Sequence, residues 1–208
     1  MEVAQKPKWP NNSILKKYDD EALSRIVMFY VFYSPGSKTT YLARKIKEYY
    51  EWSNPWRSPY QLDKQLQNGN EITIKHSDNL DKLDNNLKEI GLKKFPISEL
   101  SSYREIICVY KPKSSNCAIF DEVFRHIRNS LAHGRFLIYP IDDKDFIFEL
   151  EDVQKDSTDN KYKVSARMLI KKSTLIRWID IIEGGEKKYH KSQRKSFKKT
   201  EKIRREKK

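Results

Sequence analysis

The chain has 208 residues, of which 34% are charged and 38% hydrophobic, and this length suits one domain with its own core. The longest unbroken apolar run, Ile26 to Tyr33, is too short to cross a bilayer, which argues against a membrane protein. The opening residues are polar and do not resemble a signal peptide, and there are only two cysteines, so we expect a cytoplasmic protein with reduced thiols.

The formal net charge of +13 is concentrated at one end of the chain. Residues 186–208 contain 12 Lys and Arg against 3 Glu, and this segment therefore carries +9 of the total. We expect a domain over residues 1–185 and a basic, disordered tail over residues 186–208. Such a tail attracts RNA without reading its sequence, although a purely solubilising role is equally open.

The first part of the chain predicts two helices. One begins at Asp19 or Asp20 and continues to about Tyr33, and its apolar end predicts burial. The other begins at Ser37 and carries an apolar stripe made of Leu42, Ala43, Ile46, Tyr49 and Tyr50.

The same region has features of three other kinds of site. Residues 20–52 have the outline of a helix-turn-helix, which leaves a DNA-binding regulator open. A phosphate loop at Gly36-Ser37-Lys38-Thr39 is disfavoured, because Val31 stands where the upstream glycine is needed. The aromatic residues of segment 49–60 could stack on bases, but they more often fix a loop against the core.

The middle of the chain predicts a short strand and two further helices. The strand covers Glu71 to Lys75. One helix begins at Ser77 or Asp78 and ends at Gly91, and the next covers Ser98 to about Tyr110, before Pro112.

A helix from Asn116 to Gly134 is the most informative stretch. Asn116 is its expected N-cap, and Gly134 suits the position just beyond the helix end. Its apolar stripe contains Phe120, Val123, Phe124, Ile127 and Leu131. The other face is unusually rich in polar groups: Asp121, Arg125, His126, Arg128, Asn129 and His133.

The apolar period changes after Gly134. Residues 135–139 and 145–152 predict a pair of strands joined by a turn, and residues 164–170 suggest a third strand. Ser173 caps a last helix, which we expect to end at Gly184-Gly185.

The polar face of the 116–134 helix contains groups suited to phosphate chemistry. Asn129 and His133 lie four residues apart and therefore on one face, in the same row as Arg125. His133 is at the negative end of the helix dipole, which favours its protonated ring, and Arg128 donates in a fork that fits phosphate. A proton shuttle and a fixed cation are the minimum for cleaving a phosphate ester, although local capping and pairing would explain the same residues.

The segment Arg128-Asn129-Ser130-Leu131-Ala132-His133 resembles the signature of the HEPN family, which is an Arg, a polar residue and three further residues, then a His. The helix around it and the following Gly-Arg-Phe are similar to a plasmid- and phage-defence-associated branch of that family. The resemblance implies a mainly α fold, an HEPN-like helical bundle with a small antiparallel β-hairpin inserted before the last helix.

The resemblance also implies a function. It is that of a metal-independent endoribonuclease that cleaves RNA by 2′-OH attack, acting as a toxin in phage defence, abortive infection or a toxin–antitoxin system. Arg128 would hold the scissile phosphate, His133 would act as general acid or base, and Asn129 would orient one of them. Arg125 and His126 lie outside the signature and are auxiliary candidates.

The partners implied are RNA, a second copy of the chain in a homodimer, and an antitoxin protein. No cofactor and no metal are expected. A structural zinc at Cys108, Cys117, His126 and His133 is disfavoured, because the spacing matches no compact zinc module. A non-catalytic HEPN-like module that binds RNA or a partner remains the main alternative.

Overall fold

The computed structural model describes residues 20–36, 39–56, 62–68, 71–96, 104–142, 144–155 and 161–186. The expected lead-in before Asp19, the Ser37 cap and the basic tail beyond residue 186 lie outside these ranges, as does the end of the aromatic segment, residues 57–60.

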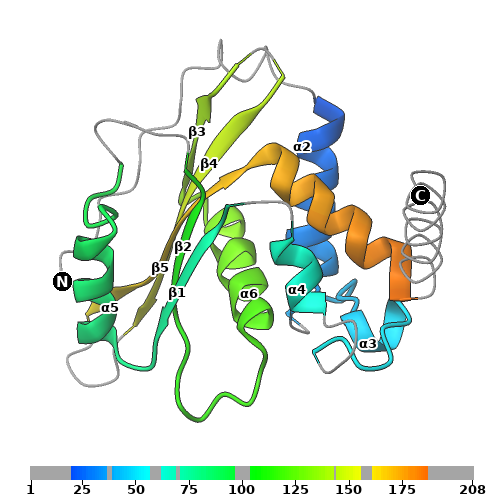
Figure 1. Ribbon diagram of the computed structural model, residues 1–208, viewed down its shortest axis with the longest axis horizontal. Helices are drawn as coiled ribbons and strands as arrows, with labels where there is room; N and C mark the ends of the chain where they lie inside the picture. Colours follow the sequence, from blue (N-terminus) through cyan, green and yellow to red (C-terminus); the bar gives the residue numbers. More distant parts are fainter. Residues whose placement is uncertain are drawn as a thin grey trace, which may run out of the picture.

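A five-stranded mixed sheet runs through the centre of the protein (Figure 1). Its strands, in the spatial order β1-β2-β5-β4-β3, are β1 (Thr73–Ser77), β2 (Ile106–Tyr110), β5 (Tyr162–Lys171), β4 (Phe146–Lys155) and β3 (Phe136–Pro140). The β1–β2 pair is parallel, and the other three pairs are antiparallel. The predicted mainly α bundle is therefore wrong, because the expected hairpin is one edge of a sheet that spans the domain.

The main error concerns β2. Residues 98–110 were predicted as a helix, yet Ile106–Tyr110 pairs with strands on both sides, and residues 107–109 are buried. A short apolar run that is covered on both faces has no polar face from which a period can be read, so a buried strand and a buried helix give the same pattern. The parallel pairing itself requires the crossover through helix α5 (Leu80–Glu89).

The helices form layers on the two faces of the sheet. Figure 1 shows α5 on one face, and α6, α2 and the C-terminal helix on the other. The elements on that second side are α2 (Asp20–Val27), the π-helix η1 (Met28–Tyr33), α4 (Leu62–Gln67), α6 (Ile119–Ala132) and the C-terminal helix of residues 172–186. None of the described helices is both long and apolar enough to cross a membrane.

The predicted first helix is confirmed over residues 20–33, but the second is not. Only α3 (Ile46–Tyr49) is helical between residues 39 and 56, and four residues cannot serve as the recognition helix of a helix-turn-helix. The described part of residues 20–52 therefore gives no support to the DNA-binding alternative.

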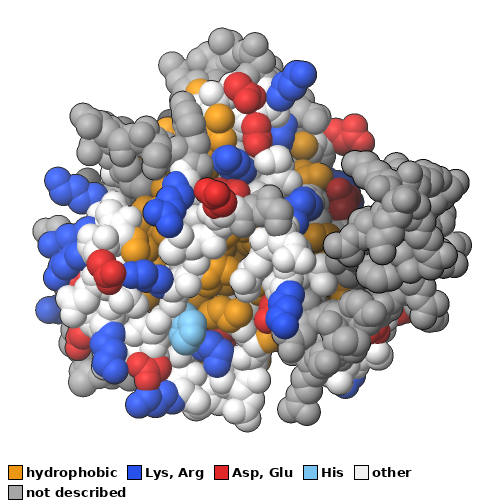
Figure 2. All heavy atoms as spheres, in the orientation of Figure 1, with side chains coloured by type: hydrophobic (Ala, Val, Ile, Leu, Met, Phe, Trp, Pro, Cys, Tyr) orange, Lys and Arg blue, Asp and Glu red, His pale blue; other side chains and the backbone are white. Residues whose placement is uncertain are grey.

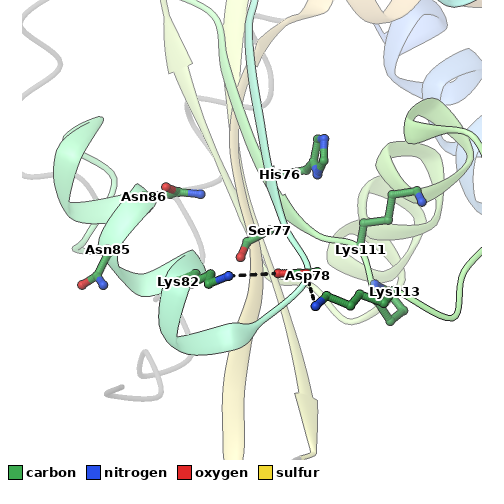
Figure 3. Close-up of a pocket in the computed structure, with 9 residues that line it drawn as sticks. His76, Ser77, Asp78, Lys82, Asn85, Asn86, Lys111 and Lys113 are labelled. Atoms are coloured by element: carbon green, nitrogen blue, oxygen red, sulfur yellow. Dashed lines mark ion pairs between the residues drawn. The ribbon is translucent and has the colours of Figure 1, made fainter.

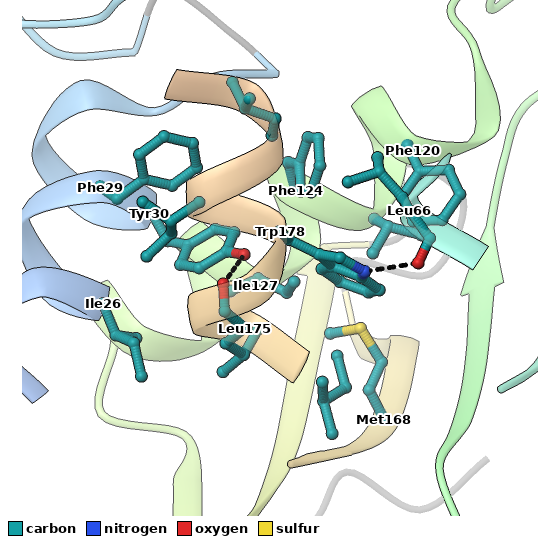
Figure 4. Packing of buried hydrophobic residues seen from close by; sticks show 14 of the residues in the cluster. Ile26, Phe29, Tyr30, Leu66, Phe120, Phe124, Ile127, Met168, Leu175 and Trp178 are labelled. Atoms are coloured by element: carbon teal, nitrogen blue, oxygen red, sulfur yellow. Dashed lines mark hydrogen bonds between the residues drawn. The ribbon is translucent and has the colours of Figure 1, made fainter. Parts of the chain in front are cut away.

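The larger core lies between the sheet and the α6 side (Figure 4). Trp178 of the C-terminal helix is fully buried, and its ring meets that of Phe120 edge-on with centroids 5.3 Å apart. Its indole N–H donates to the carbonyl of Leu66 at 2.7 Å, and the Tyr30 hydroxyl donates to the carbonyl of Leu175 at 3.0 Å. The apolar stripe of α6 is thus held against the sheet and two other helices, which fixes where its polar face lies.

Gly36, in the turn after η1, allows the chain to approach α6 closely. A Cβ atom on Gly36 would lie 2.5 Å from the backbone oxygen of Asp121 and 3.2 Å from Cβ of Phe124. This close approach, and not a phosphate loop, explains the glycine.

We predict that Gly36→Ala lowers the free energy of unfolding by about 2 kcal/mol, because the added methyl group must push the turn after η1 away from α6. Urea unfolding measures the loss. Gly91→Ala is the matched control: its φ is +79°, but its Cβ would meet nothing within 4 Å, so it reports backbone strain without a clash. A Gly36→Ala chain as stable as the natural one would show that the approach is not tight.

Candidate active site

Helix α6 presents the motif at its C-terminal end. It begins at Ile119, two residues later than predicted, and Asp121 accepts a hydrogen bond from the backbone N–H of the N-cap residue Ala118 at 3.2 Å. It ends at Ala132, and His133 is the exposed C-cap. Gly134 has a φ of +64°, which turns the chain directly into β3.

A buried carboxylate lies beneath the motif. Asp152, on β4, is 3% exposed, and its Oδ2 accepts from Nδ2 of Asn129 at 3.1 Å and lies 2.7 Å from Nδ1 of His126. Sequence reasoning did not identify Asp152, which is 19 residues beyond the motif. A signal was available: the run of β4 is apolar and buried, yet it contains three acids, and buried acids need partners.

The imidazole of His126 is completely buried, so it is a positioning group in this structure. Nδ1 donates to Asp152, and Nε2 lies 3.0 Å from the carbonyl of Tyr110 and 3.1 Å from Nη2 of Arg125. The Tyr110 carbonyl needs a proton on Nε2, whereas the Arg125 contact needs a lone pair there, and the carboxylate fixes a proton on Nδ1 in either case. His126 thereby joins α6 to the ends of β2 and β4.

A β-bulge brings Asp152 to this position. The pairing of β4 with β5 passes from Asp152–Ala166 directly to Val153–Val164, so that Ser165 is the extra residue. Bulges twist a sheet locally and re-aim side chains, and they are frequent beside active sites. The bulge also turns Val164 to the α5 side, although its alternation with Ala166, Met168 and Ile170 in the sequence suggested a single face.

Arg128 has unused donor capacity. Its Nη1 donates to Oδ1 of Asn129 at 3.1 Å, while its Nε is buried and has no hydrogen-bond partner in the described part of the chain. A buried guanidinium donor without a partner is costly, and an anion supplied from outside would satisfy it. Asn129 therefore connects the guanidinium group of Arg128 to the carboxylate of Asp152 by two hydrogen bonds.

Arg125 lies three residues before Arg128 on α6, where an acid binds its side chain. Its Nε donates to Oε2 of Glu122 at 2.8 Å, and Ser115 donates to Oε1 of the same carboxylate at 2.7 Å. Burial would raise the pKa of Glu122, but the Ser115 hydrogen bond and the Arg125 charge together lower it below its ordinary value. With Glu122 ionised, Arg125 is neutralised locally, which leaves Arg128 as the cation better placed for a substrate.

Arg128 and His133 are not brought together within one chain. Five residues of α-helix separate two side chains by about 140° round the axis. The ring of His133 is exposed and makes no hydrogen bond in the described part of the chain. The zinc alternative receives no support either: Cys108 packs on the α5 side while His126 lies on the α6 side, and the described residues contain no cluster of three potential metal ligands.

The acid before Asp152 acts on the opposite face of the sheet. Glu151 is fully buried and pairs with Arg135, which follows the motif turn, and with Arg167, whose Nε donates to it at 2.9 Å. Arg167 also donates to the carbonyl of Leu92 at 2.8 Å, at the end of the α5 segment.

A comparison with protein families decides the relationship. The model of the family described as HEPN pEK499 p136 matches residues 40–188, which include the whole motif and most of the domain. The chain belongs to the HEPN family. The expectation drawn from Arg128 to His133 is thereby confirmed at the level of the family. Comparison with curated proteins gave no significant match, and neither did comparison with solved structures.

We predict that Asp152→Asn lowers the free energy of unfolding by about 2 kcal/mol or more, because the negative charge is lost and the new amide nitrogen must face N–H donors on either side. It faces either His126 and Asn129, or the backbone N–H of Val153, which donates to Oδ1 of Asp152 at 2.9 Å. The substitution should also remove the strongly hydrogen-bonded Nδ1–H resonance of His126 from the proton NMR spectrum.

The matched control is Glu149→Gln. Glu149 is a buried acid on the same strand, but it accepts from the Tyr139 hydroxyl on the α5 face. It should cost stability while leaving the His126 resonance in place. If Asp152→Asn keeps that resonance, Asp152 does not anchor the motif.

Proposed function

We propose that the protein is a metal-independent endoribonuclease whose catalytic residues are Arg128 and His133, with Asn129 orienting Arg128. The observation that supports this most is the buried, unpartnered Nε of Arg128 beside the motif. A phosphodiester oxygen is an anion that fits a guanidinium donor fork, so a phosphate would complete this environment. The family match to residues 40–188 supports the proposal, because ribonucleases are typical members of the HEPN family.

The chemistry proposed needs no group beyond the protein and the RNA. His133 removes the proton of the ribose 2′-OH, and the 2′-oxygen attacks the adjacent phosphorus while the bond to the 5′-oxygen breaks. The leaving 5′-oxygen takes a proton from a second acid, and the products are a 2′,3′-cyclic phosphate and a free 5′-OH. Arg128 stabilises the charge that grows on the non-bridging oxygens.

A homodimer is part of this proposal. Within the motif one chain offers a single exposed imidazole, that of His133, whereas the reaction needs a base and an acid on opposite sides of the phosphorus. A two-fold axis close to His133 would supply the second imidazole and a second Arg128, since an isologous contact repeats each group. The two guanidinium groups would also concentrate positive charge where an RNA strand enters.

We expect cleavage to require the 2′-hydroxyl and to continue in EDTA. Replacing the nucleotide before the cut by its deoxy form should stop cleavage at that bond, as seen on a sequencing gel. His133→Ala and Arg128→Ala should each lower the rate by at least about 100-fold, in line with the usual contribution of an acid–base or oxyanion group. Both should unfold near the temperature of the natural chain, because neither belongs to the apolar stripe.

Cutting at the deoxynucleotide, or loss of activity in EDTA, contradicts the mechanism. RNA that is bound but left intact by the natural chain would favour the non-catalytic alternative. The same variants test the cellular role that we propose, a toxin of a defence or toxin–antitoxin system restrained by an antitoxin protein. Induced expression of the natural chain should arrest growth, and His133→Ala should not.

Sedimentation should show a dimer. Chains with Arg128→Ala, mixed with chains with His133→Ala, then separate two arrangements. Recovered activity indicates that one site uses groups from both chains. A monomer at all concentrations that retains full activity contradicts the shared site.

A further inference from the structure

A second polar site lies away from Arg128 and His133, at the carboxyl ends of the parallel strands β1 and β2. A cavity of about 440 Å³ opens there between α5 and the loop that leads from β2 to α6 (Figure 3). Ligands of open sheets with parallel strands commonly bind at this edge, beyond the carboxyl ends of the strands. The family motif does not include any residue of this cavity.

The cavity has an excess of positive charge. Lys82, Lys111 and Lys113 line it, and Asp78 is its one acid. Figure 3 shows Lys82 and Lys113 converging on that acid, with Nζ to carboxylate distances of 3.8 and 3.2 Å. One carboxylate cannot balance three ammonium groups, so the site carries about two net positive charges at neutral pH. Figure 2 shows Lys and Arg side chains, with acids among them, gathered over α5 and the adjacent strand ends.

Uncharged hydrogen-bonding groups face the same space. Asn85 and Asn86 follow Lys82 by three and four residues, so α5 directs all three side chains to one side. Neither carboxamide makes a hydrogen bond in the described part of the chain. The exposed ring of His76 lines the cavity from the other side of β1 (Figure 3). A carboxamide offers a donor and an acceptor at the spacing of a base edge.

The cavity is connected to the motif helix by hydrogen bonds. Lys111 follows Tyr110, whose carbonyl contacts His126, and its Nζ donates to the carbonyl of Ser115 at 2.9 Å. The Ser115 hydroxyl in turn donates to Glu122 of α6 at 2.7 Å. A ligand in the cavity would therefore contact the same loop that leads into the motif helix.

We propose that this cavity binds one nucleotide of the RNA strand that the motif cleaves, with its phosphate on the lysines and its base on Asn85 and Asn86. The proposal rests on the proposed function for the identity of the strand. The volume exceeds what a phosphate ion needs and lies in the range of small-molecule sites, and the lining offers both cations for a phosphate and carboxamides for a base. The site would set which bond is presented to Arg128 and His133.

The test is RNA binding by the full chain carrying His133→Ala, measured by fluorescence anisotropy with a labelled single-stranded oligonucleotide. Adding Lys82→Gln and Lys113→Gln should weaken binding about tenfold and reduce the salt slope by about 1.4, the value for two phosphate contacts on a single strand. These side chains are 70% and 83% exposed, so their loss should not affect folding.

The matched control is Lys47→Gln with Lys64→Gln, which removes the same charge from exposed positions outside the cavity. It should change the affinity by less than about twofold. Adding Asn85→Ala and Asn86→Ala instead should weaken binding and reduce discrimination among adenine, uracil and cytosine homopolymers while leaving the salt slope unchanged. Equal losses for the cavity pair and the control pair overturn the proposal.

Photocrosslinking with 4-thiouridine RNA locates the strand directly. Crosslinked peptides should contain residues 76–86 or 111–113, and their absence from a crosslinked complex overturns the proposal. AMP should compete with RNA for this crosslink; AMP that binds without being displaced by RNA identifies a free-nucleotide site instead. Because these readouts use a chain lacking His133, they succeed or fail independently of the cleavage mechanism.

Discussion

A single buried carboxylate, that of Asp152, joins the sheet to helix α6. Burying an unpaired charge costs several kcal/mol, so the carboxylate must remain within reach of its donors on His126 and Asn129. That requirement fixes both the rotation of α6 over the sheet and its position along its own axis. The apolar stripe determines which face of the helix is buried, but a hydrophobic contact is not directional and would tolerate sliding. The hydrogen bonds to the Asp152 carboxylate are directional and therefore prevent this sliding. They also orient Arg128, because Asn129, which donates to Asp152, accepts a hydrogen bond from Arg128.

The part of the site that lies on one helix could be predicted, because neighbours on a helix follow from spacing alone. The motif residues, the turn at Gly134 and the buried stripe of α6 all belong to one continuous segment. Asp152 and the Tyr110 carbonyl could not be placed, since they reach the site only through the pairing of β2, β5 and β4. Tertiary pairing of distant strands leaves no local period in a sequence. The acids within the apolar β4 segment were nevertheless a usable sign that this strand has polar partners.

The fold was misjudged for a related reason. The antiparallel strands β3 and β4 are close in sequence and alternate, so a hairpin was visible. β1 and β2 are joined through α5 and a long connection, and β2 is buried on both faces, so its residues lack the alternation that would have shown a strand. β4 and β5 are also buried over most of their length, but a turn before β4 and an alternating run in β5 marked them as strands. The terminal helix itself is confirmed, because Trp178 and its apolar neighbours recur at helical spacing. Its predicted limits are wrong: it begins at residue 172, before the expected cap Ser173, and continues through Gly184 and Gly185 to residue 186.

The two adjacent acids on β4 also constrain the alignment of that strand. Glu151 faces Arg135 and Arg167 on the α5 side, and Asp152 faces His126 and Asn129 on the α6 side. Sliding β4 by one residue would exchange the two faces, so that each carboxylate would lose its donors and enter an apolar layer. Neighbouring registers are therefore penalised twice, once on each side of the sheet. The acids that orient the motif therefore also fix the register of β4. A chain that paired β4 in another register would lose its fold and its candidate site together.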